Sequence, residues 1–180
     1  MINIFQPSIK KDSIKLLQDV FDSNWLGRGD LVQDFEKKVT AFLGIPHENF
    51  HTISSCSDAI FACIRVFSFP KNSKIIIPTN SFPAIPSAII EAGHEPVIID
   101  LDLSTGNISL DALIKAKKKY KDIKAIFITD YGGIPNDIKK IKDLMNSDCK
   151  ILVDAAGSLG TFIENKFSGY GADFVCRSYK

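Results

Sequence analysis

The chain has 180 residues, of which 45% are hydrophobic and 24% charged, which is enough for one substantial core and shows no bias toward disorder. Its 22 Lys and Arg residues nearly balance 21 Asp and Glu residues, and the lysine-rich stretches 114–124 and 137–145 have the spacing of helix surfaces, which argues against a nucleic-acid partner. The four cysteines form no CxxC pair, and we find no signal peptide and no apolar run long enough to span a bilayer. We therefore expect a cytoplasmic protein with reduced thiols and no membrane partner.

Helical spacing of apolar residues predicts two helices at the start of the chain, over 12–22 and 30–43, within an N-terminal helical segment 1–45. From residue 46 to 180, strand and helix signals alternate. Candidate strands cover 51–54, 74–78, 96–100, 124–129, 150–153 and 173–177, and candidate helices lie near 57–68, 82–92, 109–119 and 137–146. Such a βαβ series predicts an α/β domain with a mainly parallel sheet, helices on both faces, and ligands at the carboxyl ends of the strands.

Asp154 ends the apolar strand 150–153 and is followed by small residues in the sequence DAAGSLG. A carboxylate at the end of a buried strand costs free energy unless it meets a cation or hydrogen-bond donors. Asp154 is therefore either a turn cap or the anchor of a ligand in the space that the small residues leave.

The turn Ser54-Ser55-Cys56-Ser57 leads directly into a predicted helix. Free N–H groups at a helix start favour an anion such as a phosphate, and the Ser57 hydroxyl would add a donor. The alternative is that a serine or Asp58 only caps the helix.

Phe82 follows the strand 74–78 at the mouth of the next helix, where it either stacks on a flat ring or packs in the core. No GxGxxG, P-loop or GxSxG motif is present, which argues against a dinucleotide-binding module. The three histidines, His47, His51 and His94, lack the spacing of metal ligands, and no metal site is predicted.

Taken in order, the segments LGRGDLVQDFEKKVTAFLGI, SSCSDAI, NSFPAIPSAIIEAGHEPVIIDLDLSTGNIS, YGGIPND, VDAAGSLG and GADFVCRSYK resemble the N-terminal half of the DegT/DnrJ/EryC1/StrS aminotransferases. The resemblance covers nearly all of the chain. It implies a fold type I PLP-transferase large domain, that is, a mainly parallel seven-stranded sheet with helices on both faces, here truncated. It also implies pyridoxal 5'-phosphate (PLP) as cofactor, bound by the incomplete large domain 46–180, with the C-terminal small domain absent.

The resemblance also assigns roles to five residues of the expected cofactor site. Asp154 matches the Asp that pairs with the protonated ring nitrogen, which lets the ring draw electrons from the substrate. Phe82 matches the aromatic that stacks on the ring. Ser57, Asp58 through its N–H group, and Ser178 match the groups that bind the cofactor phosphate.

Three departures from the family pattern put polar contacts in doubt: Cys56 replaces a glycine, Val153 replaces an acidic residue, and Gly157 replaces a polar one. The lysine that binds the cofactor covalently is expected at position 183, but the chain ends at Lys180, which would be the nucleophile only if the match were shifted. We therefore expect the chain as given to be inactive by itself and to expose apolar surface that the remaining half would cover.

Three functions remain open. The first is an aminotransferase that moves an amino group from an amino acid, with glutamate the expected donor, to the keto group of a nucleotide-linked sugar in amino-sugar or surface-polysaccharide biosynthesis, working as a homodimer. The second is a sugar dehydratase of the same family, in which a His replaces the lysine. The third is a non-catalytic fragment that keeps the fold. Residues beyond Lys180 would separate them.

Overall fold

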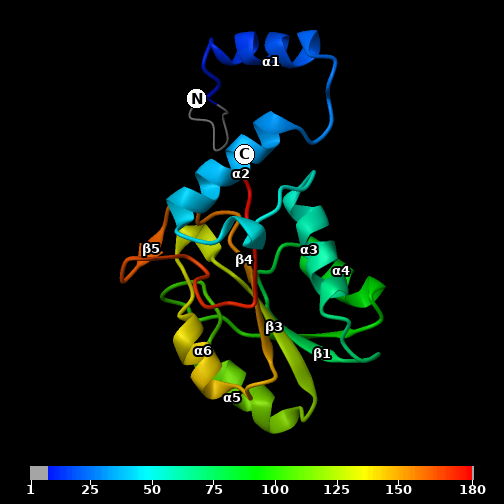
Figure 1. Cartoon of the computed structure of the whole chain (residues 1–180). Helices are drawn as coiled ribbons and strands as arrows, with labels where there is room; N and C mark the ends of the chain where they lie inside the picture. Colours follow the sequence, from blue (N-terminus) through cyan, green and yellow to red (C-terminus); the bar gives the residue numbers. More distant parts are fainter. Residues whose placement is uncertain (1–7, 180) are drawn as a thin grey trace, which may run out of the picture. The chain divides into compact units, whose positions relative to one another are not determined.

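The computed structural model describes residues 8–179, and the chain divides into two compact units, the first ending at Thr52 and the second running from Ile53 to Tyr179 (Figure 1). The predicted boundary between residues 45 and 46 stays a prediction, since compactness alone does not show where a domain folds independently. No helix of residues 8–179 is long and apolar enough to cross a membrane.

The first unit contains the helices α1 (Ser13–Asp22) and α2 (Asp30–Leu43) and the short 3-10 helix η1 (His47–Asn49). Both α-helices match their predicted ranges to within a residue. Gly44 ends α2 in the left-handed conformation (φ 66°), where its lack of a Cβ avoids strain. Within α2, the carboxylate of Glu36 is fully buried and accepts hydrogen bonds from Arg28 and Thr52.

The second unit is a five-stranded, all-parallel sheet in the order β2-β1-β3-β4-β7. Its strands are β1 (Lys74–Pro78), β2 (Glu95–Ile99), β3 (Ile123–Thr129), β4 (Lys150–Asp154) and β7 (Phe174–Cys176). Its helices are α3 (Cys56–Val66), α4 (Ala84–Glu91), α5 (Leu110–Lys119) and α6 (Ile138–Leu144), with a 3-10 turn η2 (Tyr131–Gly133) after β3. A small antiparallel hairpin, β5 (Phe162–Ile163) and β6 (Lys166–Phe167), lies between β4 and β7 in sequence.

Alternate residues of each central strand enter two different cores. Ile76, Ile126 and Ile151 pack under α5 and α6, whereas their neighbours Ile75 and Phe127 pack under α3 and α4. Helices therefore cover both faces of the sheet (Figure 1), which explains why the strands are continuous apolar runs instead of alternating ones. The predicted parallel α/β fold is confirmed.

One strand prediction is wrong. Residues 51–54 form no strand, because the N–H of Thr52 donates to the Glu36 carboxylate and not to a neighbouring strand. The sheet of the described residues has five strands, fewer than the seven of the full fold, in keeping with the expected truncation.

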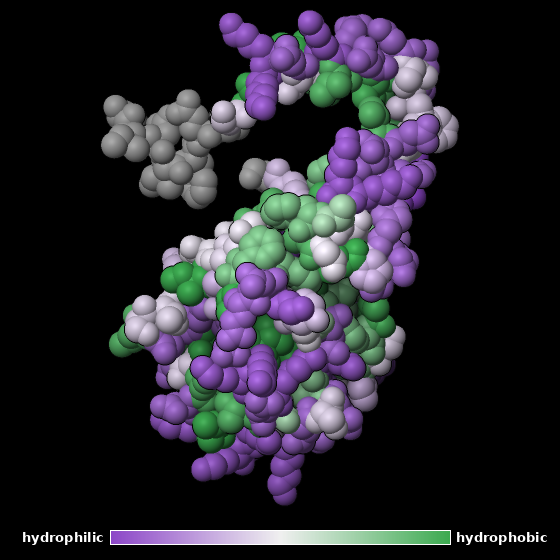
Figure 2. All heavy atoms as spheres, turned by 60° about the vertical axis from the view of Figure 1, so that its left-hand side comes forward, coloured by the Kyte–Doolittle hydropathy of each residue, from purple (hydrophilic) through white to green (hydrophobic). Residues whose placement is uncertain are grey.

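Several large apolar side chains reach the surface of the second unit, in keeping with the expectation of uncovered apolar surface. Those beyond the carboxyl ends of the strands include Phe82, Tyr131, Ile134, Leu159, Phe162 and Tyr170. On the face seen in Figure 2, apolar atoms likewise emerge between charged ones. These residues are candidates for burial by other parts of a larger protein.

Candidate active site

Asp154 is the last residue of β4, at the carboxyl edge of the sheet. The parallel register places it between Thr129, the last residue of β3, and Cys176, the last residue of β7. Because the carboxyl ends of parallel strands share one edge, the loops after β1, β3, β4 and β7 all start there. This edge carries most of the residues that the sequence singled out.

The Asp154 carboxylate is buried, with 5% of the residue exposed, and makes no ion pair with any residue of the described chain. One oxygen, Oδ1, accepts a hydrogen bond from the N–H of Ala156 at 3.1 Å, so the turn-cap interpretation holds for that oxygen. Burial raises the pKa of Asp154, the Ala156 N–H opposes this, and the nearby charge of Asp130 raises the pKa further. A cationic partner would relieve both costs.

The neighbouring Thr129 hydroxyl is also buried, and its oxygen has no hydrogen-bond partner among residues 8–179. A buried polar atom without a partner is uncommon and marks a place where a further group fits. A buried carboxylate without a cation, beside an unpaired hydroxyl, suits a cationic group that can also form a hydrogen bond.

The turn before α3 shows both capping and features of an anion site. Ser55 is the N-cap: its hydroxyl accepts from the Asp58 N–H at 3.1 Å, and the hydroxyls of Ser54 and Ser55 donate to the Asp58 carboxylate at 2.7 and 2.8 Å. These two hydroxyls lower the pKa of Asp58. The expected use of the Asp58 N–H for a phosphate stays a prediction, and it requires that Ser55, which accepts from this N–H here, release it.

Ser57 and Ser178 remain as donors for an anion. Ser57 is half-buried in the first turn of α3, and its hydroxyl makes no hydrogen bond to another described residue. Figure 1 shows α3 beginning at the end of the sheet where β4 and β7 finish, as expected for a helix antiparallel to the strands. Ser178, also half-buried, follows β7 by two residues.

Phe82 lies between β1 and α4 with 54% of its surface exposed. The alternative that it packs in the core is therefore wrong. Its ring stands free to cover a flat group at the carboxyl edge. Lys180, the alternative nucleophile, lies outside the described residues.

The sequence reasoning missed a buried polar cluster around Asp130, the residue that follows β3. Only 2% of Asp130 is exposed, and its carboxylate accepts hydrogen bonds from the N–H and side-chain amide of Asn136, both at 2.9 Å, and from the hydroxyls of Ser158, at 3.1 Å, and Ser168. Its backbone N–H donates to the Asp154 carbonyl at 3.0 Å. A signal was present, since Asp130 ends a buried strand just as Asp154 does.

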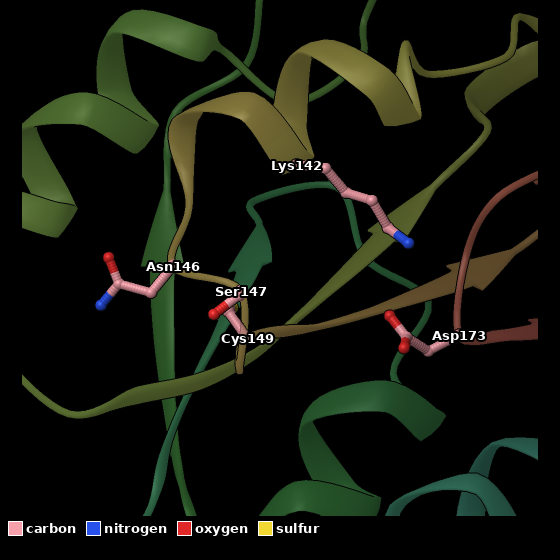
Figure 3. A pocket seen from close by; sticks show the side chains of 5 residues that line it. All are labelled: Lys142, Asn146, Ser147, Cys149 and Asp173. Carbon is pink, nitrogen blue, oxygen red and sulfur yellow. The ribbon is translucent and has the colours of Figure 1, made fainter.

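A hollow at the opposite edge of the sheet is not part of this site (Figure 3). It is lined by Lys142, Asn146, Ser147, Cys149 and Asp173, which lie before or near the starts of β4 and β7. Burial raises the pKa of the Cys149 thiol to about 12, so this sulfur stays protonated and is a poor nucleophile.

A parallel sheet between two helix layers, with a buried carboxylate at the end of one strand, makes the second unit an α/β domain, and its structural neighbours include aminotransferases. The solved structure of an aminotransferase, TlmJ from Streptoalloteichus hindustanus, superposes with a TM-score of 0.87 and 29% identity over 94% of this chain and 46% of that one. A family model matches residues 7–180, and the chain belongs to the DegT/DnrJ/EryC1/StrS aminotransferase family.

Two further relatives show the range of named activities. The dTDP-4-dehydro-2,3,6-trideoxy-D-glucose 4-aminotransferase of Saccharopolyspora spinosa is 28% identical over 99% of this chain and 46% of its own length. The E. coli GDP-4-keto-6-deoxy-D-mannose-3-dehydratase with bound hydrated PLP has a TM-score of 0.84 and 25% identity over 96% of this chain and 46% of that one. The chain thus spans about half the length of the proteins it matches.

Proposed function

We propose that this chain forms the cofactor-binding half of a PLP-dependent aminotransferase that acts on the keto group of a nucleotide-linked sugar. The observation that carries the proposal is Asp154, a buried carboxylate without a cationic partner among the described residues, at the carboxyl edge of a sheet of this family. A carboxylate in this state favours a protonated ring nitrogen.

Four of the described residues would contact the ring and the phosphate of the cofactor, and the covalent lysine is expected outside them. Asp154 would hold the proton on the ring nitrogen, with the Ala156 N–H fixing one of its oxygens. The exposed ring of Phe82 would cover one face, and Ser57 and Ser178 would donate to the phosphate. When bound, PLP supplies an electron sink that makes the C–H bond of an amino acid acidic. Asp58 would contribute its N–H only if Ser55 released it.

The sugar substrate is proposed from the relatives, whose names specify keto sugars linked to dTDP or GDP. Glutamate is the proposed amino donor by family analogy. A sugar dehydratase is the second candidate, favoured by the structural match to the E. coli dehydratase. Both activities would share the contacts of Asp154, Phe82 and the two serines.

The decisive experiment uses the purified full-length gene product loaded with PLP. Incubation with glutamate alone should give stoichiometric 2-oxoglutarate and pyridoxamine phosphate, measured by chromatography, with Asp154→Asn as the matched control. A dTDP- or GDP-linked 4-keto-6-deoxy sugar is then added. An amino sugar as product supports the aminotransferase, a deoxy keto sugar supports the dehydratase, and absence of PLP binding refutes both.

The proposal also covers the activity of the chain by itself, its oligomeric state and its location. The 180-residue chain alone should not catalyse amino transfer, because the expected lysine position lies three residues beyond Lys180. Borohydride reduction of this chain with PLP, followed by peptide mapping, tests this, and stoichiometric labelling of Lys180 would contradict it. We also propose a homodimer, and a cytoplasmic location in keeping with four cysteines that form no disulfide in the described chain.

A further inference from the structure

We propose that Asp130 is a positioning residue for Asp154, an inference that rests on the proposed function: its hydrogen bonds fix the turn after β4 and thereby hold the Asp154 carboxylate ready for the cofactor's ring nitrogen. Asp130 touches no group that reacts. It acts through the turn Ala155–Ser158, which carries the one N–H group that orients Asp154.

The first step of the argument is the connection between the two carboxylates. The Asp130 N–H donates to the Asp154 carbonyl at 3.0 Å, which joins the ends of β3 and β4. The Ser158 hydroxyl donates to Asp130 Oδ2 at 3.1 Å, and the Ser158 N–H donates to the Ala155 carbonyl at 3.2 Å. The turn that begins at Ala155 is therefore tied at both ends to Asp130, and the Ala156 N–H lies between these ties.

The second step is that the Asp130 carboxylate serves to hold several loops together through hydrogen bonds. Its donors come from the loop after β3 (Asn136), the turn after β4 (Ser158) and the segment after β6 (Ser168), and all of these residues are buried. Burying a carboxylate costs free energy. A buried carboxylate whose hydrogen bonds are all made, such as that of Asp130, therefore suits a role in fixing the positions of the loops around it.

The third step concerns charge around the cluster. The Arg177 guanidinium donates to the Ser168 carbonyl, and burial lowers its pKa while Tyr179 and Asp130 raise it. Among the described residues, the charge of Asp130 opposes ionisation of Asp154. Its charge therefore adds to the advantage of a cation beside Asp154, in the same direction as the positioning effect.

Two substitutions of Asp130 separate the effect of its hydrogen bonds from the effect of its charge. Asp130→Ala removes both side-chain acceptors and frees the turn at Ser158, while the backbone bond to the Asp154 carbonyl remains. In Asp130→Asn, the amide oxygen can still accept from Asn136, and the amide nitrogen can donate to the hydroxyls of Ser158 and Ser168, since hydroxyls also accept. Ser158→Ala, which removes the tie to Asp130 together with the contact to the Ser168 hydroxyl, serves if Asp130→Ala fails to fold.

The test measures dissociation constants of two probes for the full-length gene product by equilibrium dialysis: PLP and its analogue with CH in place of the ring nitrogen. We expect Asp130→Ala and Ser158→Ala to weaken PLP about tenfold, the effect of losing one well-placed hydrogen bond, and to leave the analogue within about twofold. Asp130→Asn should stay within about threefold for both probes.

Other outcomes are equally informative. Wild-type PLP affinity in folded Asp130→Ala and Ser158→Ala variants overturns the inference, as does an equal loss for both probes, which would show a merely structural role. Loss in Asp130→Asn as large as in Asp130→Ala would assign the effect to charge and overturn the positioning role. If the unsubstituted protein binds no PLP, the proposed function itself fails, a result distinct from each of these.

Discussion

Glu36 offers the sharpest test of the first unit, because one fully buried carboxylate there gathers three hydrogen bonds. Arg28 donates to Oε2 at 2.6 Å, and the N–H and hydroxyl of Thr52 donate to Oε1 at 2.9 and 2.8 Å. Thr52 lies two residues before Ser54, where the turn into α3 begins. The perturbations are Glu36→Ala, which removes every acceptor, and Glu36→Gln, which keeps one.

The expected costs follow from the donors. In Glu36→Gln the amide oxygen can keep both Thr52 bonds, so only the contact with Arg28 is lost; since the Arg28 side chain is 54% exposed and can return to water, we expect a loss of about 1 kcal/mol. In Glu36→Ala both Thr52 bonds to a charged acceptor also go, at about 1.5 kcal/mol or more each, which gives about 3–5 kcal/mol together with the cavity.

Hydrogen exchange of the Thr52 amide measures this locally, with urea unfolding as the global measurement, both on the full-length gene product. The pH dependence adds a second check. Hydrogen bonds, chiefly from the Thr52 N–H, lower the pKa of Glu36 from 4.5 to about 2. Because the folded pKa lies below the unfolded one, the stabilisation is complete above about pH 5 and is lost as the pH falls toward 2. Glu36→Gln should lack this loss.

A Thr52 amide that exchanges equally fast in the wild type and in Glu36→Ala would refute the reasoning. So would a Gln variant as unstable as the Ala variant, because that result would place the stability in the ion pair and not in the Thr52 bonds.

Three further predictions concern the second unit. Asp154→Asn should reduce amino transfer at least about a hundredfold with unchanged far-ultraviolet circular dichroism, and unchanged turnover would remove Asp154 from the mechanism. Replacing Ser57 and Ser178 together by Ala should weaken PLP binding by about 1–3 kcal/mol but leave binding of pyridoxal, which lacks the phosphate, unaltered; equal losses for both compounds would contradict the assignment. Gly133→Ala should lower the unfolding midpoint more than Gly132→Ala, since both have positive φ (82° and 60°) but only the Gly133 Cβ would meet a backbone oxygen of the facing turn, at 3.1 Å; equal shifts would refute this.

Most of the fold could be predicted because the residue pattern within each segment indicates its strand or helix. The apolar runs at 74–78, 124–129 and 150–153 are buried on both faces and became strands nearly as predicted. The segment 51–54 failed for a non-local reason: its N–H at Thr52 bonds to Glu36, sixteen residues earlier, and no pattern in the segment itself reveals that partner.

Positions at the ends of elements could be predicted from the sequence. Asp154 ends a strand signal and Phe82 stands between a strand signal and a helix signal; the structure places both at the carboxyl edge, and their roles toward the cofactor stay predictions. Helix capping at this turn was one of two open interpretations, and the hydrogen bond from the Asp58 N–H to Ser55 could not be read from the sequence. The partners of Asp130 come from segments up to 38 residues away, so the cluster could not be assembled from spacing.

Two aspartates at the ends of adjacent strands therefore have opposite roles. Asp130 has four donors and pairs with protein, while Asp154 has one donor and is left with a raised pKa. Sequence alone cannot tell the two apart, since each is an Asp after an apolar run. What distinguishes them is the number of donors that the fold brings to each, and an undersupplied buried carboxylate is the one with free energy to gain from a ligand. Counting donors at strand ends thus separates the proposed anchor from its support.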